Sequence, residues 1–212
     1  MRRNESGRSM MEMLGVLSVI GLLSAGGLAG VNRLFAQQRV NKAVEQIGVM
    51  SAKLSQIGAQ SGSYDGLTIS SALKFGAVPS SAIDSPEDGT LINPFGGDIE
   101  IEPANLVPAN GDRQAYTITY DGVPEDACMA LSTYKWASKG SASLIGVGAG
   151  PSDMYKATVK NKLKQDCAGE AALTHVIGCS GGEELDLPID PVSAINACNC
   201  TEGSCFLVWM YF

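Results

Sequence analysis

Residues 13–32 read MLGVLSVIGLLSAGGLAGVN and lie between Glu12 and Arg33 without a single charge. Twenty residues of α-helix rise about 30 Å, which is roughly the thickness of a bilayer core. No second stretch of this kind occurs later in the sequence. The sequence therefore predicts one N-terminal membrane-spanning helix, followed by one large domain on a single side of the membrane.

The charges around this helix predict its orientation. Arg2, Arg3 and Arg8 precede the apolar stretch, so the positive-inside rule places the N-terminus in the cytoplasm and the large domain outside. All six cysteines fall between Cys128 and Cys205, and an even number in an exported domain favours disulfides. The apolar run is too long for a typical cleaved signal peptide and lacks an A-x-A site before the polar part.

Composition argues against several classes of function. The 212 residues carry a formal net charge of −7, and only 17% of them are charged, which does not fit a disordered acidic chain. The acidic balance argues against nucleic-acid binding, which needs Lys and Arg to neutralise phosphates. His175 is the single histidine, so a catalytic triad or a two-histidine metal centre is hard to build. We therefore expect no enzyme, no cofactor and no nucleic-acid partner.

Glu12 stands at the start of the apolar stretch, between Met11 and Met13. A carboxylate inside a membrane costs several kcal/mol unless it is paired, which makes Glu12 a candidate functional residue. The alternative interpretation is that Glu12 only marks the cytoplasmic edge of the span.

The string Gly7-Arg8-Ser9-Met10-Met11-Glu12, followed by the apolar run, resembles the N-terminal motif of type IV prepilins. The resemblance implies that a prepilin peptidase cuts between Gly7 and Arg8, after a leader of residues 1–7, and that Glu12 is the fifth mature residue. Arg8 departs from the family, whose mature chains usually start with an apolar residue. In a fibre, Glu12 of one subunit would pair with the α-amino group of a neighbour, a pair favoured in a low-dielectric helix bundle.

The same resemblance implies partners and a location. It implies a homo-oligomeric helical fibre, preceded by contacts with the lipid bilayer, the prepilin peptidase and the assembly machinery of a Gram-negative inner membrane. The pilus would then be extracellular and serve adhesion, aggregation or conjugation. A minor pilin or a type II secretion pseudopilin is a close alternative, although six cysteines count against the pseudopilin. A periplasmic binding or sensor domain on an uncleaved signal anchor is an alternative of another class.

We expect the helix to continue beyond the membrane over residues 8–62, with 9–32 as its transmembrane and assembly part. Apolar residues on a 3-4 spacing form a stripe that predicts packing on a globular head, and they are Val40, Val44, Ile47, Leu54 and Ile57. Turn residues near 58–62 predict the end of the helix. The head, residues 63–212, is predicted to be an α+β unit with an antiparallel sheet lying on the helix.

Several segments of the head predict its elements. Asn93–Gly97 is typical of a turn, Asp98–Glu102 alternates like a short edge strand, and Ala115–Tyr120 has strand composition. A short helix is expected near Pro124–Trp136. Phe206–Phe212 is apolar without alternation, which predicts a strand buried on both faces. Two further segments complete the expectations: a loop at Gly146–Gly150 and a solvated acidic face at Glu183, Glu184 and Asp186.

The order of these elements resembles the head of type IVb pilins, and the resemblance implies that Cys128 pairs with Cys200 to close a D-region over 128–200. Six cysteines allow fifteen connectivities, and for the others we predict Cys167–Cys179 and Cys198–Cys205. Zinc is the competing interpretation, because His175-x3-Cys179 and the run C-N-C-x4-C supply an imidazole and thiolates. Neither has the paired CxxC spacing of zinc sites, so we expect no metal.

Overall fold

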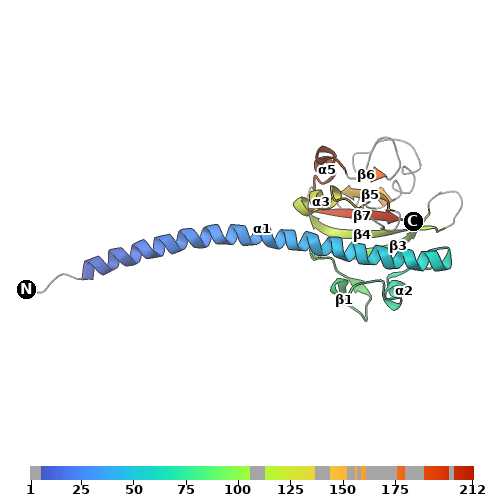
Figure 1. Ribbon diagram of the computed structural model, residues 1–212, viewed down its shortest axis with the longest axis horizontal. Helices are drawn as coiled ribbons and strands as arrows, with labels where there is room; N and C mark the ends of the chain where they lie inside the picture. The colour runs from blue at the N-terminus through green and yellow to red at the C-terminus, as the bar shows by residue number, and fades with distance from the viewer. Residues whose placement is uncertain are drawn as a thin grey trace, which may run out of the picture. The chain divides into compact units, whose positions relative to one another are not determined.

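The computed structural model describes residues 6–105, 113–136, 144–151, 156, 159–160, 176–179, 189–200 and 203–212, without the side chains of 6–9, 25–30 and 176–179. Two compact units divide the chain, Met1–Arg39 and Val40–Phe212. The first contains the N-terminal part of a long helix, and the second contains the rest of that helix and the sheet (Figure 1).

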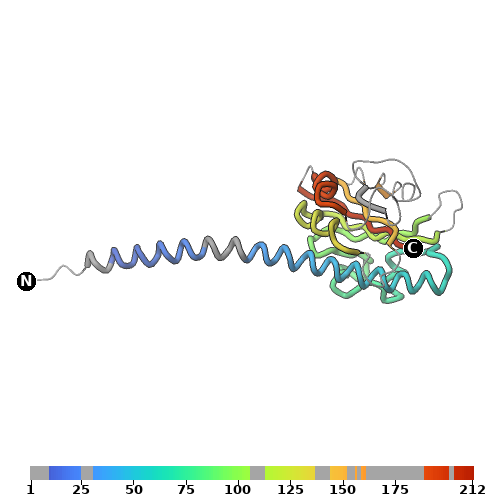
Figure 2. Tube along the Cα trace, turned by 45° about the horizontal axis from the view of Figure 1, so that its top comes forward, coloured from blue at the N-terminus to red at the C-terminus, as the bar shows by residue number. Residues whose placement is uncertain are grey.

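The long helix α1 spans Ser6–Ser61. It ends where predicted: Gly62 has a positive φ of 72° and its N–H donates to the carbonyl of Gly58 at 2.8 Å, as in many helix C-caps. Of the predicted stripe of α1, Ile47 and Leu54 are fully buried in the second unit, and Val40, Val44 and Ile57 are partly buried against its core. The prediction missed Ala43 and Met50, which are also fully buried. Figure 2 shows this part of α1 from a second angle.

Among the helices in the part of the chain that the structure describes, none is long and apolar enough to cross a membrane. The span predicted over residues 9–32 includes 25–30, whose side chains are outside the described residues. That span therefore stays a prediction.

Within the described residues of the second unit, five antiparallel strands form the main sheet, in the order β3-β4-β7-β5-β6. Their bounds are β3 Ile99–Ala104, β4 Ala115–Pro124, β5 Leu144–Gly150, β6 Val176–Cys179 and β7 Ser204–Tyr211. β3 lies at one edge, which confirms the edge strand predicted from its alternating sequence.

The C-terminal strand β7 is buried on both faces, as its continuous apolar sequence predicts. Leu207, Trp209 and Tyr211 belong to the core shared with α1, whereas Phe206 and Val208 belong to a smaller core on the opposite face. Successive side chains of a strand point to opposite faces, so β7 contributes side chains to both cores. The α+β class, with a long N-terminal helix and an antiparallel sheet, is thereby confirmed.

The prediction of a loop at Gly146–Gly150 is wrong, because these residues lie in β5 and pair with β7. Gly150 provides space for a neighbour, because a Cβ there would lie 2.6 Å from the ring of Phe206. The high glycine content suggested a loop, but in β5 a glycine allows an aromatic ring to pack closely on the strand.

Short elements complete the second unit. Between α1 and the sheet lie α2 Ile69–Lys74, the 3₁₀ turn η1 Ser80–Ala82, β1 Ile83–Ser85 and β2 Thr90–Leu91. After β4 comes α3 Glu125–Ser132, which confirms the helix expected there, and α5 Pro191–Ala197 packs against it. Asp190 caps α5 by accepting the N–H groups of Val192 and Ser193 at 2.9 and 3.0 Å.

Candidate assembly helix and disulfide-bounded head

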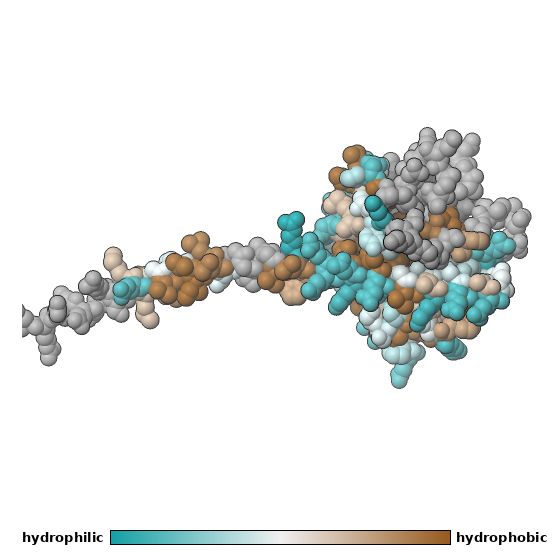
Figure 3. Space-filling model, viewed as in Figure 1, coloured by the Kyte–Doolittle hydropathy of each residue, from teal (hydrophilic) through white to brown (hydrophobic). Residues whose placement is uncertain are grey.

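The N-terminal part of α1 exposes large apolar side chains on all its sides, and Figure 3 shows some of them in brown on the face that it draws. Between residues 10 and 35 these side chains are 44–80% exposed, and they are Met10, Met11, Met13, Leu14, Val16, Leu17, Val19, Ile20, Leu22, Leu23, Val31, Leu34 and Phe35. Soluble monomers rarely expose an apolar surface of this extent, which marks a membrane or protein interaction site. A helix that is apolar all round needs to be buried on all sides, as in a membrane or a bundle of helices.

Glu12 lies within this exposed apolar surface, between Met11 at 80% and Met13 at 69% exposure. Burial of the helix would therefore bury the carboxylate too, at a cost unless a cation pairs with it. Gly7 and Arg8 fall in the first turns of α1, but their side chains are outside the described residues. The cleavage position and the role of Glu12 stay predictions.

Polar contacts hold the second half of α1 on the sheet. The hydroxyl of Tyr116 donates to the carbonyl of Ser51 at 2.9 Å, and that of Tyr120 donates to Gln46 Oε1 at 3.0 Å. Gln46 Nε2 in turn donates to the carbonyl of Ser81, 2.9 Å away in η1. Burial raises the pKa of both tyrosines above the ordinary value of 10, so both remain neutral donors. One buried glutamine thus connects α1, β4 and η1.

The disulfides correct the predicted pairing. Cys128 of α3 pairs with Cys198, not Cys200, and their Cα atoms are 5.8 Å apart. Cys205 pairs with Cys200, not with Cys198 as predicted. The cause is the packing of α5 on α3, which buries Cys198 at the C-cap of α5 beside Cys128. The disulfide-bounded region is therefore 128–198.

Other predicted residues fall outside the described part of the chain. These are Cys167 and His175, the side chain of Cys179, and the acidic residues Glu183, Glu184 and Asp186. The zinc interpretation of C-N-C-x4-C loses its ligands, because Cys198, Cys200 and Cys205 are in disulfides and offer no thiolate. Within the described ranges, no group of three His, Cys, Asp or Glu side chains is placed to hold a metal ion.

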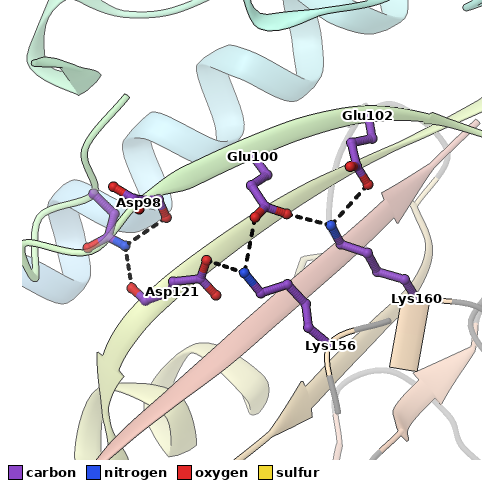
Figure 4. Close-up of polar contacts among 7 residues, drawn as sticks. Asp98, Glu100, Glu102, Asp121, Lys156 and Lys160 are labelled. Atoms are coloured by element: carbon purple, nitrogen blue, oxygen red, sulfur yellow. Dashed lines mark hydrogen bonds and ion pairs between the residues drawn. The ribbon is translucent and has the colours of Figure 1, made fainter. Parts of the chain in front are cut away.

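A cluster of five charged side chains lies on the face of the sheet opposite α1, and sequence analysis missed it (Figure 4). Lys156 Nζ bonds Glu100 Oε1 at 3.0 Å and also bonds Asp121 Oδ2. Lys160 Nζ bonds Glu100 Oε2 at 2.6 Å and Glu102 Oε2 at 2.9 Å. The alternation of DIEIE, together with lysines four residues apart, was the available clue to this ion cluster.

The ion cluster holds Lys156 and Lys160 on the sheet, where Val159 joins the smaller core with Phe206 and Val208. Both lysine side chains are largely buried, at 14% and 10% exposure. Desolvation opposes the ionised form of Glu100, but hydrogen bonds and charges from Lys160 and Lys156 outweigh it and hold its pKa below the ordinary 4.5. Burial likewise disfavours charged Lys156, yet Asp121 and Glu100 raise its pKa above 10.5.

These pKa shifts predict how the stability of the head depends on pH. The lowered pKa of Glu100 contributes stability that is present above pH 4.5 and lost as the pH falls through the folded value. The raised pKa of Lys156 contributes stability that is present below pH 10.5 and lost as the pH rises through its folded value. Urea unfolding of Glu100→Gln should therefore show a weaker loss of stability below pH 4.5 than the wild type.

Asp65→Asn provides the control for this pH series, because Asp65 pairs with Arg113 at an exposed position and its side chain is 77% exposed. Exposed pairs contribute little to stability. An Asp65→Asn profile that matches the wild type, beside a flatter Glu100→Gln profile, supports the assignment. Identical profiles for Glu100→Gln and the wild type contradict it.

Comparisons with known proteins agree with this geometry. A family model described as the N-terminal region of PilS matches residues 37–180. The major structural subunit of the bundle-forming pilus of Escherichia coli O127:H6 is 24% identical over 203 residues, which cover 96% of this chain and 92% of that protein. The toxin coregulated pilin of Vibrio cholerae is 29% identical over 138 residues, 62% of this chain and 58% of that protein.

Among solved structures, TcpA, a type IV pilin from Vibrio cholerae El Tor, shares the fold with a TM-score of 0.50 at 14% identity. The match covers 82% of this chain and 99% of TcpA. The resemblance to type IV pilins inferred from the N-terminal motif is thereby confirmed, and the chain belongs to the PilS family of type IV pilins.

Proposed function

We propose that this chain is a structural subunit of a type IV pilus of the type IVb class, polymerised through the N-terminal part of α1. The observation that carries the proposal is the apolar surface of α1 between residues 10 and 35, exposed on all sides of the helix. Bundling such helices in the core of a fibre keeps this surface from water once it has left the membrane, and its exposure there would cost about 25 cal/mol per Å² of apolar area. The relatives that cover nearly the whole chain are pilus subunits by name, which supports the same function here.

The proposed route to the fibre begins in the inner membrane. A prepilin peptidase removes residues 1–7, and the remaining helix waits in the bilayer until the assembly machinery extracts it. Cutting before the apolar run, not after it, keeps the helix on the mature chain and creates a new α-amino group beside it. The mature chain then carries a formal charge of −8, because the leader contains Arg2, Arg3 and Glu5 and takes +1 away from the total of −7.

Glu12→Ala tests the assembly step. Without the carboxylate, the α-amino group of a neighbouring subunit has no partner in the low-dielectric bundle, so we expect leader cleavage to persist while the yield of sheared fibres falls at least about tenfold, the equivalent of about 1.4 kcal/mol per contact. Electrophoresis measures cleavage, and immunoblots of sheared fibres measure yield.

Glu45→Ala is the matched control, since Glu45 is an exposed carboxylate on the same helix, in the half that packs on the sheet. It should leave both cleavage and yield unchanged. Wild-type yield and fibre geometry from Glu12→Ala would contradict the pairing. An intact mass that retains Met1–Gly7 in the protein recovered from cells would instead favour a membrane-anchored domain.

A further inference from the structure

Two arginines lie at the C-terminal end of the exposed apolar part of α1. Arg33 and Arg39 are both exposed in the first unit, and Leu34 and Phe35 beside them are 60% and 55% exposed. The hydrogen bonds and ion pairs of the described residues include neither arginine. Among the described residues, neither guanidinium group has a partner, so both are available to an anionic partner from outside the chain.

The charge of the sequence is strongly segregated around this arginine pair. No acidic residue occurs between Glu12 and Glu45, a stretch whose charges are Arg33, Arg39 and Lys42. Residues 1–39 contain five arginines and two glutamates, a formal +3, which leaves −10 for residues 40–212 out of the total of −7. An anionic surface therefore attracts the arginine pair, while it repels residues 40–212 with their net negative charge.

The spacing of the arginine pair distinguishes between kinds of partner. Six residues of α-helix rise about 9 Å and turn the side chain by about 120° around the axis, so Arg33 and Arg39 do not share one face. A protein docking on one side of the helix would contact one of them. A layer of lipid headgroups surrounds a helix and reaches both. The exposed Leu34 and Phe35 between the arginines are apolar side chains of the kind that helices bury at the boundary between headgroups and acyl chains.

We propose that Arg33 and Arg39 bind the phosphate groups of anionic phospholipids where α1 leaves the outer leaflet of the inner membrane, and so hold the unassembled subunit in the membrane. This inference rests on the membrane stage of the proposed function. Arginine suits the role because its guanidinium forms bidentate hydrogen bonds to phosphate. Its long aliphatic stem lies on the apolar interface while the charge reaches the headgroups.

Partition of the full-length chain between two kinds of vesicle tests the proposal. The chain, solubilised in detergent, is added to an equal mixture of phosphatidylcholine vesicles and vesicles that also contain phosphatidylglycerol, the detergent is removed so that the chain inserts, and the two kinds of vesicle are separated by density. Each arginine near an anionic surface is expected to favour it about fivefold, so the preference of the wild type should exceed that of Arg33→Gln/Arg39→Gln about 25-fold at low salt. High salt should remove most of this difference.

Lys74→Gln is the control, because it removes one exposed cation at the end of α2 and should leave the preference at the wild-type value. Equal partition of the wild type and the double variant would overturn the proposal. Equal partition combined with a lower fibre yield for the double variant would assign the arginines to a second copy of the chain, which also overturns it. Failure of the chain to enter either kind of vesicle would refute the membrane stage itself.

Discussion

Replacing Cys128 and Cys198 together by alanine is expected to lower the free energy of unfolding of the head by about 4 kcal/mol, because their disulfide closes a loop across a sequence separation of 70 residues. In the chain-entropy model, this cross-link restricts the unfolded chain more strongly than a short one does. The disulfide also ties α3 to α5, two short helices that would be marginal without tertiary support.

Urea unfolding followed by tryptophan fluorescence measures this loss. Trp136 and Trp209 are the two tryptophans of the chain, and both are buried in the core of the second unit, so the signal reports the head alone. The matched control is Cys200→Ala with Cys205→Ala, whose disulfide spans a separation of only 5 residues and should contribute about 2 kcal/mol. Equal losses in the two double variants would contradict the loop-length argument.

Gly97→Ala is expected to destabilise the head by about 3 kcal/mol, at the upper end for overpacking. A Cβ at position 97 would lie 2.0 Å from the carbonyl oxygen of Asp121 and 2.5 Å from its carbonyl carbon. Both atoms belong to the backbone and cannot rotate away. The same carbonyl accepts a hydrogen bond from Asn93 Nδ2 at 2.7 Å, so a backbone shift would also disturb the turn at residues 93–97.

Gly48→Ala is the control of opposite sign. Gly48 is exposed on α1, and a Cβ there meets nothing within 4 Å. Alanine in a helix is more favourable than glycine by about 0.5–1 kcal/mol, so this variant should unfold at higher urea concentration than the wild type. A Gly97→Ala protein as stable as the wild type would show that β3 and β4 separate easily at this end.

Local patterns predicted α1, β3, β4, α3 and β7, but none of the other elements. The 3-4 spacing identified the face of α1 that Ile47 and Leu54 bury, and the unbroken apolar run identified a strand with two buried faces. Such patterns work because burial repeats with the period of the helix or the strand. The same reasoning was wrong for Gly146–Gly150, which belong to the buried strand β5. There Gly150 packs under the ring of Phe206, which lies far along the chain.

By itself, the sequence determined the long apolar helix, the α+β class, the position of Glu12 and the pilin family, since all of these depend on residues close together in the chain. Only the tertiary structure decided the partner of Cys128, because Cys198 and Cys200 are two residues apart and packing alone determines which of them faces α3. It likewise brought Lys156 and Lys160 to the carboxylates of β3 and β4, more than thirty residues away in the sequence. Disulfides and ion clusters depend on distances in space, which the order of residues does not encode locally.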